Sequence, residues 1–191
     1  MRNEVNSFNT KLLLSNTLKE LLKKKSFSEL TVTEIIKISQ VNRNTFYYHF
    51  EDIYDLLRWL LEQEAIDTVR GYDSIDDIDK AINFTLDYIE ENRSFLKNII
   101  FSVGEHDLKR FLSKDFTEIV ENFIRLAEKD LDVKIDDNYR DFLSTYNTEA
   151  IAGILIELIY SKENISREKI NYYIQVTTSN CIIGSLKAYN N

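Results

Sequence analysis

The chain has 191 residues, a formal net charge of −8 and one cysteine, Cys181, so internal disulfide bonds are excluded and a reducing compartment is expected. It has no proline and four glycines, where average usage gives about ten and about thirteen; this argues against a sheet protein rich in tight turns. A chain of this length can bury a core of its own, so disorder is not expected.

Four helices are predicted in the first third of the chain, because apolar residues recur there at helical spacing. Thr31 is followed three residues later by Glu34, the pattern of a capping box, and Asn42 can cap the next helix through its side-chain oxygen. The predicted helices cover residues 9–25, 31–38 and 43–50, and a fourth runs from residue 51 or 52 towards 68.

Further stripes of helical period follow a break at residues 71–74, and no internal repeat or low-complexity linker separates them. They lie at residues 75–89, 95–101, 108–127, 139–160 and 170–186. We therefore predict an all-α fold of about nine helices, in which the fourth helix joins the amino-terminal helices to the remainder.

Charge is distributed unevenly along the chain. Residues 1–50 carry a balance of +4, whereas the other 141 residues sum to −12. Such asymmetry indicates a basic module that contacts a polyanion and an acidic body that stays away from it.

Residues 31–50 have the layout of a helix-turn-helix, a motif that places its second helix in the major groove of DNA. Val41 and Phe46 are apolar where the turn and that helix must pack, and its other faces are polar or aromatic. Arg and Asn read base edges, whereas Thr, Tyr and His mostly bond to phosphates. The side chains expected to contact DNA are Arg43, Asn44, Thr45, Tyr47, Tyr48 and His49.

Three segments resemble the amino-terminal signature of TetR-family regulators. They are LTVTEII at 30–36, VNRNTFYYHF at 41–50 and DLL at 55–57. Within the family, YYHF followed by YDLL is most similar to the branch that includes regulators of dihydroxyacetone-kinase operons. The resemblance covers about residues 9–61.

The resemblance implies a DNA-binding transcriptional regulator that acts as a homodimer on a pseudo-palindromic, double-stranded DNA operator. It implies a helix-turn-helix domain over residues 1–52 and a helical dimerisation and effector domain over 53–191, whose effector is a small molecule or a partner protein. By position, Thr33 and Tyr47 would meet phosphates, and Lys37 would add positive charge. Repressors are commoner in the family, but the dihydroxyacetone-kinase branch includes activators, so the sign of regulation stays open.

Two places depart from the family pattern. Gln40 stands in the turn where the family often has glycine, which is tolerated if the backbone there does not need a positive φ. Residues 51–53 (Glu-Asp-Ile) replace a stretch where family members often supply a lysine to the DNA backbone, so weaker DNA affinity is expected. More of the electrostatic attraction then falls to Lys23, Lys24, Lys25, Lys37 and Arg43.

The last two predicted helices are rich in apolar and small residues, which let helices approach closely. They form either the central core of one chain or, as the resemblance favours, a four-helix interface between two chains. The expected interface residues are Ile151, Ile154, Leu155, Leu158, Ile174, Cys181 and Ile182. Aromatic and amide side chains typical of small-molecule pockets are Phe84, Tyr88, Asn98, Phe101, Tyr146 and Asn147.

No metal site, cofactor or enzymatic activity is expected. His49 and His106 are the only histidines, neither has a cysteine or carboxylate at metal-ligand spacing, and no nucleophile with a neighbouring base is visible. The rival interpretation is a protein-interaction module whose helix-turn-helix no longer binds DNA, which the net acidity and the acidic residues at 51 and 52 suggest. Without an apolar leader or a span of membrane length, a cytoplasmic protein with no membrane partner is expected.

Overall fold

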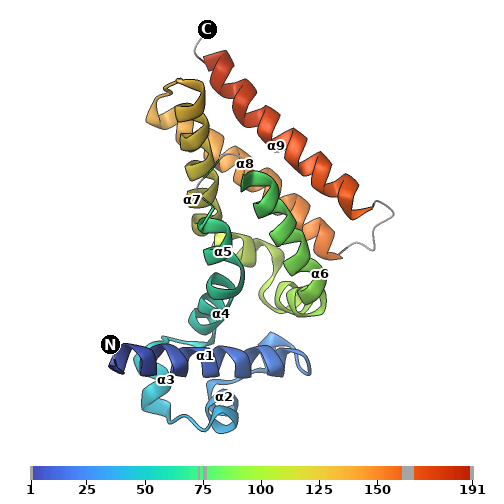
Figure 1. The fold of residues 1–191 in the computed structure, drawn as a ribbon. Coiled ribbons are helices and arrows are strands. Elements are labelled where there is room, and N and C mark those ends of the chain that lie inside the picture. The colour runs from blue at the N-terminus through green and yellow to red at the C-terminus, as the bar shows by residue number, and fades with distance from the viewer. Residues whose placement is uncertain (1, 73, 75–76, 161–165, 190–191) are drawn as a thin grey trace. The chain divides into compact units, whose positions relative to one another are not determined.

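The computed structural model describes residues 2–72, 74, 77–160 and 166–189, and all the regular structure in these residues is helical (Figure 1). The prediction of an all-α fold is confirmed, with a helix count close to nine. The α-helices are α1 (Arg2–Leu22), α2 (Val32–Ser39), α3 (Arg43–His49), α4 (Ile53–Leu61), α5 (Asp67–Arg70), α6 (Ile78–Val103), α7 (Glu105–Leu131), α8 (Asp137–Tyr160) and α9 (Arg167–Tyr189). A 3₁₀ turn, η1 (Phe27–Glu29), follows α1, and a π-helical turn, η2 (Glu62–Ile66), follows α4.

Contacts divide the chain into two compact units, and helix α6 contributes to both. The amino-terminal unit contains the residues up to Glu64 together with residues 94–108. The carboxy-terminal unit contains residues 65–93 and the residues from 109 onward. Asn92, inside α6, has non-helical backbone angles (φ −112°, ψ 15°), so the helix is kinked close to the point where its residues pass from one unit to the other.

Side-chain caps start α2, α3 and α4, and the caps of α2 and α3 are those that the sequence predicts. Thr31 and Asn42 each accept a hydrogen bond from the backbone N–H three residues later, at 3.3 and 2.8 Å. Asp52 accepts from the N–H groups two and three residues later, at 2.8 and 2.9 Å. Each cap satisfies donors that have no partner within their own helix, which fixes where the helix begins.

Three predicted boundaries were wrong. Helix α1 extends from Arg2 to Leu22, because no glycine or proline among the first residues interrupts it. The stripes at 75–89 and 95–101 belong to the single helix α6, which is kinked but not ended between them. The fourth helix does not run unbroken, since α4 ends at Leu61 and the π-helical turn separates it from α5.

Each unit buries apolar side chains of its own. The large side chains that are fully buried in the amino-terminal unit are Leu14, Leu18, Ile35, Phe46, Leu56, Leu57, Leu60, Ile99 and Ile100. Those in the carboxy-terminal unit are Ile124, Ile182 and Leu186. Among the described residues, no helix is both long enough and apolar enough to cross a membrane.

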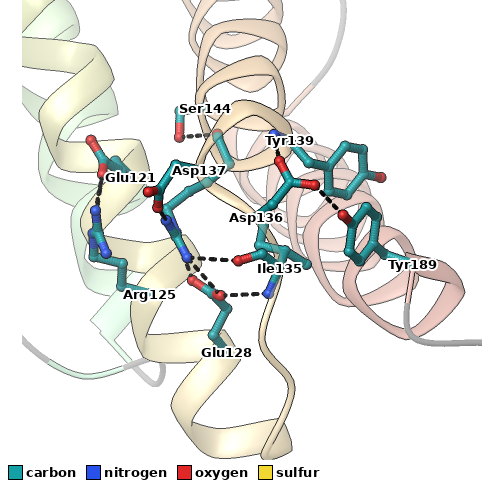
Figure 2. A network of polar contacts seen from close by, with 10 residues as sticks. Glu121, Arg125, Glu128, Ile135, Asp136, Asp137, Tyr139, Ser144 and Tyr189 are labelled. Atoms are coloured by element: carbon teal, nitrogen blue, oxygen red, sulfur yellow. Dashed lines mark hydrogen bonds and ion pairs between the residues drawn. The ribbon is translucent and has the colours of Figure 1, made fainter.

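A buried ion pair joins α7 to the start of α8 (Figure 2). The Arg140 Nε and Nη2 atoms donate to the two Glu128 carboxylate oxygens at 2.9 and 3.0 Å. Glu128 also accepts from the Ile135 N–H at 3.1 Å, and Arg140 donates to the Ile135 carbonyl at 3.2 Å. The pair therefore holds the segment between the two helices, and its hydrogen bonds keep the pKa of Glu128 below the ordinary value.

Candidate nucleic-acid interface

The turn between α2 and α3 places one residue in the left-handed region of the backbone. Gln40 has φ 56° and ψ 30°, and its N–H donates to the Ile36 carbonyl to end α2. A residue other than glycine was expected to be tolerated here only at a negative φ. Gln40 has a positive φ, so this condition is not met. Side chains with a Cβ are strained in this region.

Replacing Gln40 with glycine should raise the free energy of unfolding by about 0.5–1 kcal/mol. Relief of left-handed strain is worth roughly 1–2 kcal/mol, and the extra chain entropy of glycine offsets about 0.5–1 kcal/mol of it. Urea unfolding followed by far-UV circular dichroism measures the change. Gln175→Gly, inside α9, should instead destabilise the protein by about 1 kcal/mol, and a loss of stability in both variants would contradict the strain at Gln40.

Helix α3 presents two different faces. Phe46 is fully buried and Phe50, just after the helix, is 3% exposed, and their ring centroids lie 6.0 Å apart. Tyr48 is 80% exposed, and the other residues expected at DNA are exposed or half-buried: Thr33, Lys37, Arg43, Asn44, Thr45, Tyr47 and His49. Anchoring by the two phenylalanines thus leaves a polar and aromatic face outward.

Arg43 and Tyr47, one turn apart on α3, hold each other in place. The guanidinium carbon lies 5.4 Å from the centre of the tyrosine ring, and Nη2 lies 3.4 Å from the hydroxyl oxygen. Cation–π contact and a long hydrogen bond limit the rotamers of both side chains. Less entropy is then lost when the pair meets a ligand.

His49 contributes no full positive charge at neutral pH. Partial burial lowers the pKa of its imidazole below the ordinary value of 6.5, and the positive charge of Lys11 lowers it further. The neutral ring still carries one donor and one acceptor. His49 is therefore suited to a hydrogen bond with a phosphate or a base, whereas Arg43 and the lysines supply the charge.

Carboxylates offset part of the positive charge near α1 and α2. Lys23 pairs with Glu20 at 2.5 Å, and Lys25 pairs with Glu34 at 2.6 Å. Asp52 lies in the stretch where family members often supply a phosphate-binding lysine. In this chain it has a structural function as the cap of α4. A carboxylate there also interacts favourably with the positive end of the helix dipole.

Asn98, on the second half of α6, fastens the connection between α1 and α2. Its Oδ1 accepts from the Phe27 N–H at 3.1 Å, and its Nδ2 donates to the carbonyls of Leu22 and Lys25 at 2.7 and 2.6 Å. Ser102 accepts from the same Phe27 N–H at 3.1 Å. Sequence reasoning placed Asn98 in a pocket and did not single out Ser102, since nothing local indicates partners more than seventy residues away.

Two family models match the chain. One, described as bacterial regulatory proteins of the tetR family, matches residues 16–60, which contain α2, α3 and most of α4. The other, described as a transcriptional regulator C-terminal region, matches residues 76–180, more than half of the chain. The chain belongs to the TetR family of transcriptional regulators. This confirms the resemblance in the sequence and makes α2 and α3 the helix-turn-helix of a DNA-binding regulator.

Individual members of the TetR family match nearly the whole chain. The HTH-type dhaKLM operon transcriptional activator DhaS of Lactococcus lactis subsp. lactis (strain IL1403) is 23% identical over 180 residues, 94% of this chain and 92% of that protein. A solved structure named dihydroxyacetone kinase operon activator DhaS superposes with a TM-score of 0.67 at 21% identity, over 95% of this chain and 98% of that one. A TetR transcriptional regulator from Streptococcus agalactiae 2603V has a TM-score of 0.60 at 20% identity, over 93% and 98%. These structures share the fold.

Most residues expected at the TetR-type dimer interface are covered by their own chain. Six are buried or half-buried: Ile151, Leu155, Leu158, Ile174, Cys181 and Ile182. Ile154 is 44% exposed. The large apolar side chains that α8 and α9 do leave exposed are Phe142, Tyr146, Ile154, Tyr160, Tyr172, Tyr173, Val176 and Tyr189.

The six residues expected to line a pocket are not brought together. Asn98 and Phe101 belong to the amino-terminal unit, and the other four to the carboxy-terminal unit. Phe101 is 85% exposed and Tyr146 is 56% exposed. Asn147 is buried and donates to the Leu143 carbonyl at 2.8 Å, while Phe84 and Tyr88 are half-buried.

A different set of residues lines a partly open cavity in the carboxy-terminal unit. The cavity has a volume of about 90 Å³ and an almost wholly apolar wall. A concave, mostly apolar wall is typical of small-molecule sites, so the cavity is a candidate effector site in the described residues. The wall consists of Val69, Ile78, Ala81, Ile82, Thr85, Leu86, Phe116, Ile119, Val120, Phe123, Ile151, Leu155, Ile174, Thr178 and Ile182.

Proposed function

We propose that this TetR-family regulator binds a pseudo-palindromic operator as a homodimer, and that an effector bound by the carboxy-terminal unit changes its affinity for DNA. The outward face of α3 carries the DNA-binding part of the proposal, because Arg43, Tyr47 and Tyr48 are exposed while Phe46 is fully buried. Such a face gives nothing to the stability of its own core and matches what a recognition helix presents to DNA.

Selection of genomic DNA fragments by the purified protein, at two salt concentrations, tests the operator. A pseudo-palindrome should be recovered, and sedimentation of the complex should give two chains per site. Absence of enrichment at low salt would instead favour the protein-interaction module. Binding that weakens as salt rises is expected, since phosphate contacts release counterions.

Arg43→Ala should weaken binding to the selected operator by about 1–3 kcal/mol and relax its sequence preference at one base pair, if the guanidinium reads a base. If Arg43 contacts a phosphate instead, binding to all sequences should weaken alike. Fluorescence anisotropy with the operator and single-base variants distinguishes the two roles. Arg125→Ala, on α7 and paired with Glu121, is the matched control and should leave DNA affinity unchanged. Unchanged binding in the Arg43 variant would remove Arg43 from the interface.

The exposed faces of α8 and α9 support dimerisation. Gly153 and Gly184 are exposed on these helices, and a Cβ at either would meet nothing within 4 Å. Glycine weakens a helix by about 1 kcal/mol relative to alanine, and nothing within the described part of one chain requires it. Close approach of helices from a second chain would require it, and such an interface would also cover exposed apolar side chains of α8 and α9.

Helix α6 supports coupling between effector and DNA. Its first half supplies five residues to the cavity wall, and its second half carries Asn98, which is bonded to the connection before α2. A molecule in the cavity that binds more tightly to one arrangement of α6 would increase the population of that arrangement. The size of the shift is set by the difference between its affinities for the two arrangements, and the helix-turn-helix would follow α6. The Lactococcus relative is named as a transcriptional activator, so activation of transcription is the first mode of regulation to test.

A further inference from the structure

The wall of the cavity in the carboxy-terminal unit contains almost nothing that can bond to a polar molecule. Thirteen of its fifteen residues are apolar and the other two are Thr85 and Thr178. The Thr85 hydroxyl already donates to the Ala81 carbonyl at 2.8 Å. No charged side chain is among the fifteen described residues that form the wall.

These properties decide what the cavity can hold. A buried water needs two to four polar partners, and an apolar cavity of about 150 Å³ in another protein stays dry and binds benzene or xenon. A polar or charged guest would lose its hydration without replacement, which is unfavourable. An apolar guest would regain the dispersion contacts that an empty cavity lacks.

We propose that this cavity is a binding site for a small, uncharged, apolar molecule such as a single aromatic ring, and that it rejects polyols and charged metabolites of the same size. The role of the bound molecule as the effector rests on the proposed function. Binding itself is argued only from the apolar residues of the cavity wall. Ile78, Ala81, Ile82, Thr85 and Leu86 all lie on α6, so the occupant would contact the helix that carries Asn98.

Direct binding is tested with the full chain and three probes: xenon, benzene and dihydroxyacetone, which has as many non-hydrogen atoms as benzene. Methyl NMR should show shifts of the isoleucine signals in the cavity wall with xenon and benzene, and none with dihydroxyacetone at the same concentration. Absence of shifts with xenon and benzene, or saturable binding of dihydroxyacetone at this wall, would overturn the proposal.

Filling the cavity provides the matched variants. Ala81→Leu places three further carbon atoms at the wall and should weaken benzene binding at least tenfold, whereas Ala188→Leu adds them at an exposed position near the end of α9 and should leave it unchanged. If Ala81→Leu does not fold, Thr178→Ile on α9 replaces the hydroxyl with an ethyl group, one non-hydrogen atom more, and should cause a partial loss of benzene binding. Equal benzene binding in wild type and filled variants would contradict this location.

Operator affinity, measured with and without benzene, separates the inference from the proposed function. A change in the wild type that Ala81→Leu abolishes supports both. Benzene binding without any change in operator affinity supports the site and counts against the coupling through α6. Normal operator binding with no binding of xenon or benzene overturns the site alone.

Discussion

Arg140→Ala should lower the free energy of unfolding by about 3–5 kcal/mol, because it leaves a buried carboxylate without its partner. Arg140 is 5% exposed and Glu128 is 8% exposed. Two hydrogen bonds join them, and each also bonds to the backbone of Ile135. In the variant, the desolvation of the Glu128 carboxylate is no longer offset by an ion pair. The segment that leads into α8 also loses its hydrogen bond from Arg140.

Urea unfolding of Arg140→Ala is best compared with Arg125→Ala, a variant in the same unit. Arg125 pairs with Glu121 one turn away on the surface of α7, and such pairs are worth about 0.3–0.5 kcal/mol. The double variant Glu128→Leu/Arg140→Met should recover most of the stability, since it removes both charges. Similar small losses for Arg140→Ala and Arg125→Ala would show that the ion pair does not hold this connection.

The same pair has a defined pH dependence. Arg140 holds the pKa of the Glu128 carboxyl below its ordinary value of 4.5, so the stability that it contributes is present above that value and is lost as pH falls through the folded-state pKa. In Arg140→Ala, loss of the guanidinium raises the Glu128 pKa above its wild-type value, so acidification costs the folded variant less stability. The difference in stability should therefore shrink as pH falls from neutral to below 4.5, and a constant difference would exclude Glu128 as the group that loses its ion-pair partner.

The features predicted correctly from sequence are those decided over a few residues. The caps Thr31 and Asn42 act on N–H groups three positions away, so their spacing was visible. The outward face of α3 followed from a short helix in which Phe46 had to point inward. The uneven charge distribution and the run of residues 41–50 indicated the family.

Features that depend on distant packing could not be predicted. The backbone angle of Gln40 stayed open in the sequence because an exposed, flexible side chain does not determine φ. The cavity draws residues from five helices, and four of these residues, Ile151, Leu155, Ile174 and Ile182, were expected at a dimer interface instead. Asn98 lies beside buried isoleucines in α6, and its partners are 71–76 residues away.

Asn98→Ala should lower the stability of the amino-terminal unit by about 2–3 kcal/mol, because three backbone groups lose a hydrogen bond worth roughly 1 kcal/mol each and one of them, the Phe27 N–H, keeps Ser102 as a second acceptor. Those groups are the Phe27 N–H and the carbonyls of Leu22 and Lys25, which join α1 to the helix-turn-helix. Trp59 is the single tryptophan of the chain and lies in this unit, so its fluorescence reports the unfolding directly. Operator affinity should fall as well, since the connection before α2 is no longer fixed.

Two further variants decide whether the amide acts as a donor to these carbonyls. Asn98→Asp keeps the acceptor for the Phe27 N–H but turns a carboxylate oxygen towards the two carbonyls, so it should be at least as destabilising as alanine despite its matching shape. Asn180→Ala removes an exposed amide that donates only to the Val176 carbonyl of its own helix, and it should change stability by less than about 0.5 kcal/mol. An Asn98→Asp variant as stable as wild type would mean that the hydrogen bonds to the carbonyls of Leu22 and Lys25 contribute nothing to stability.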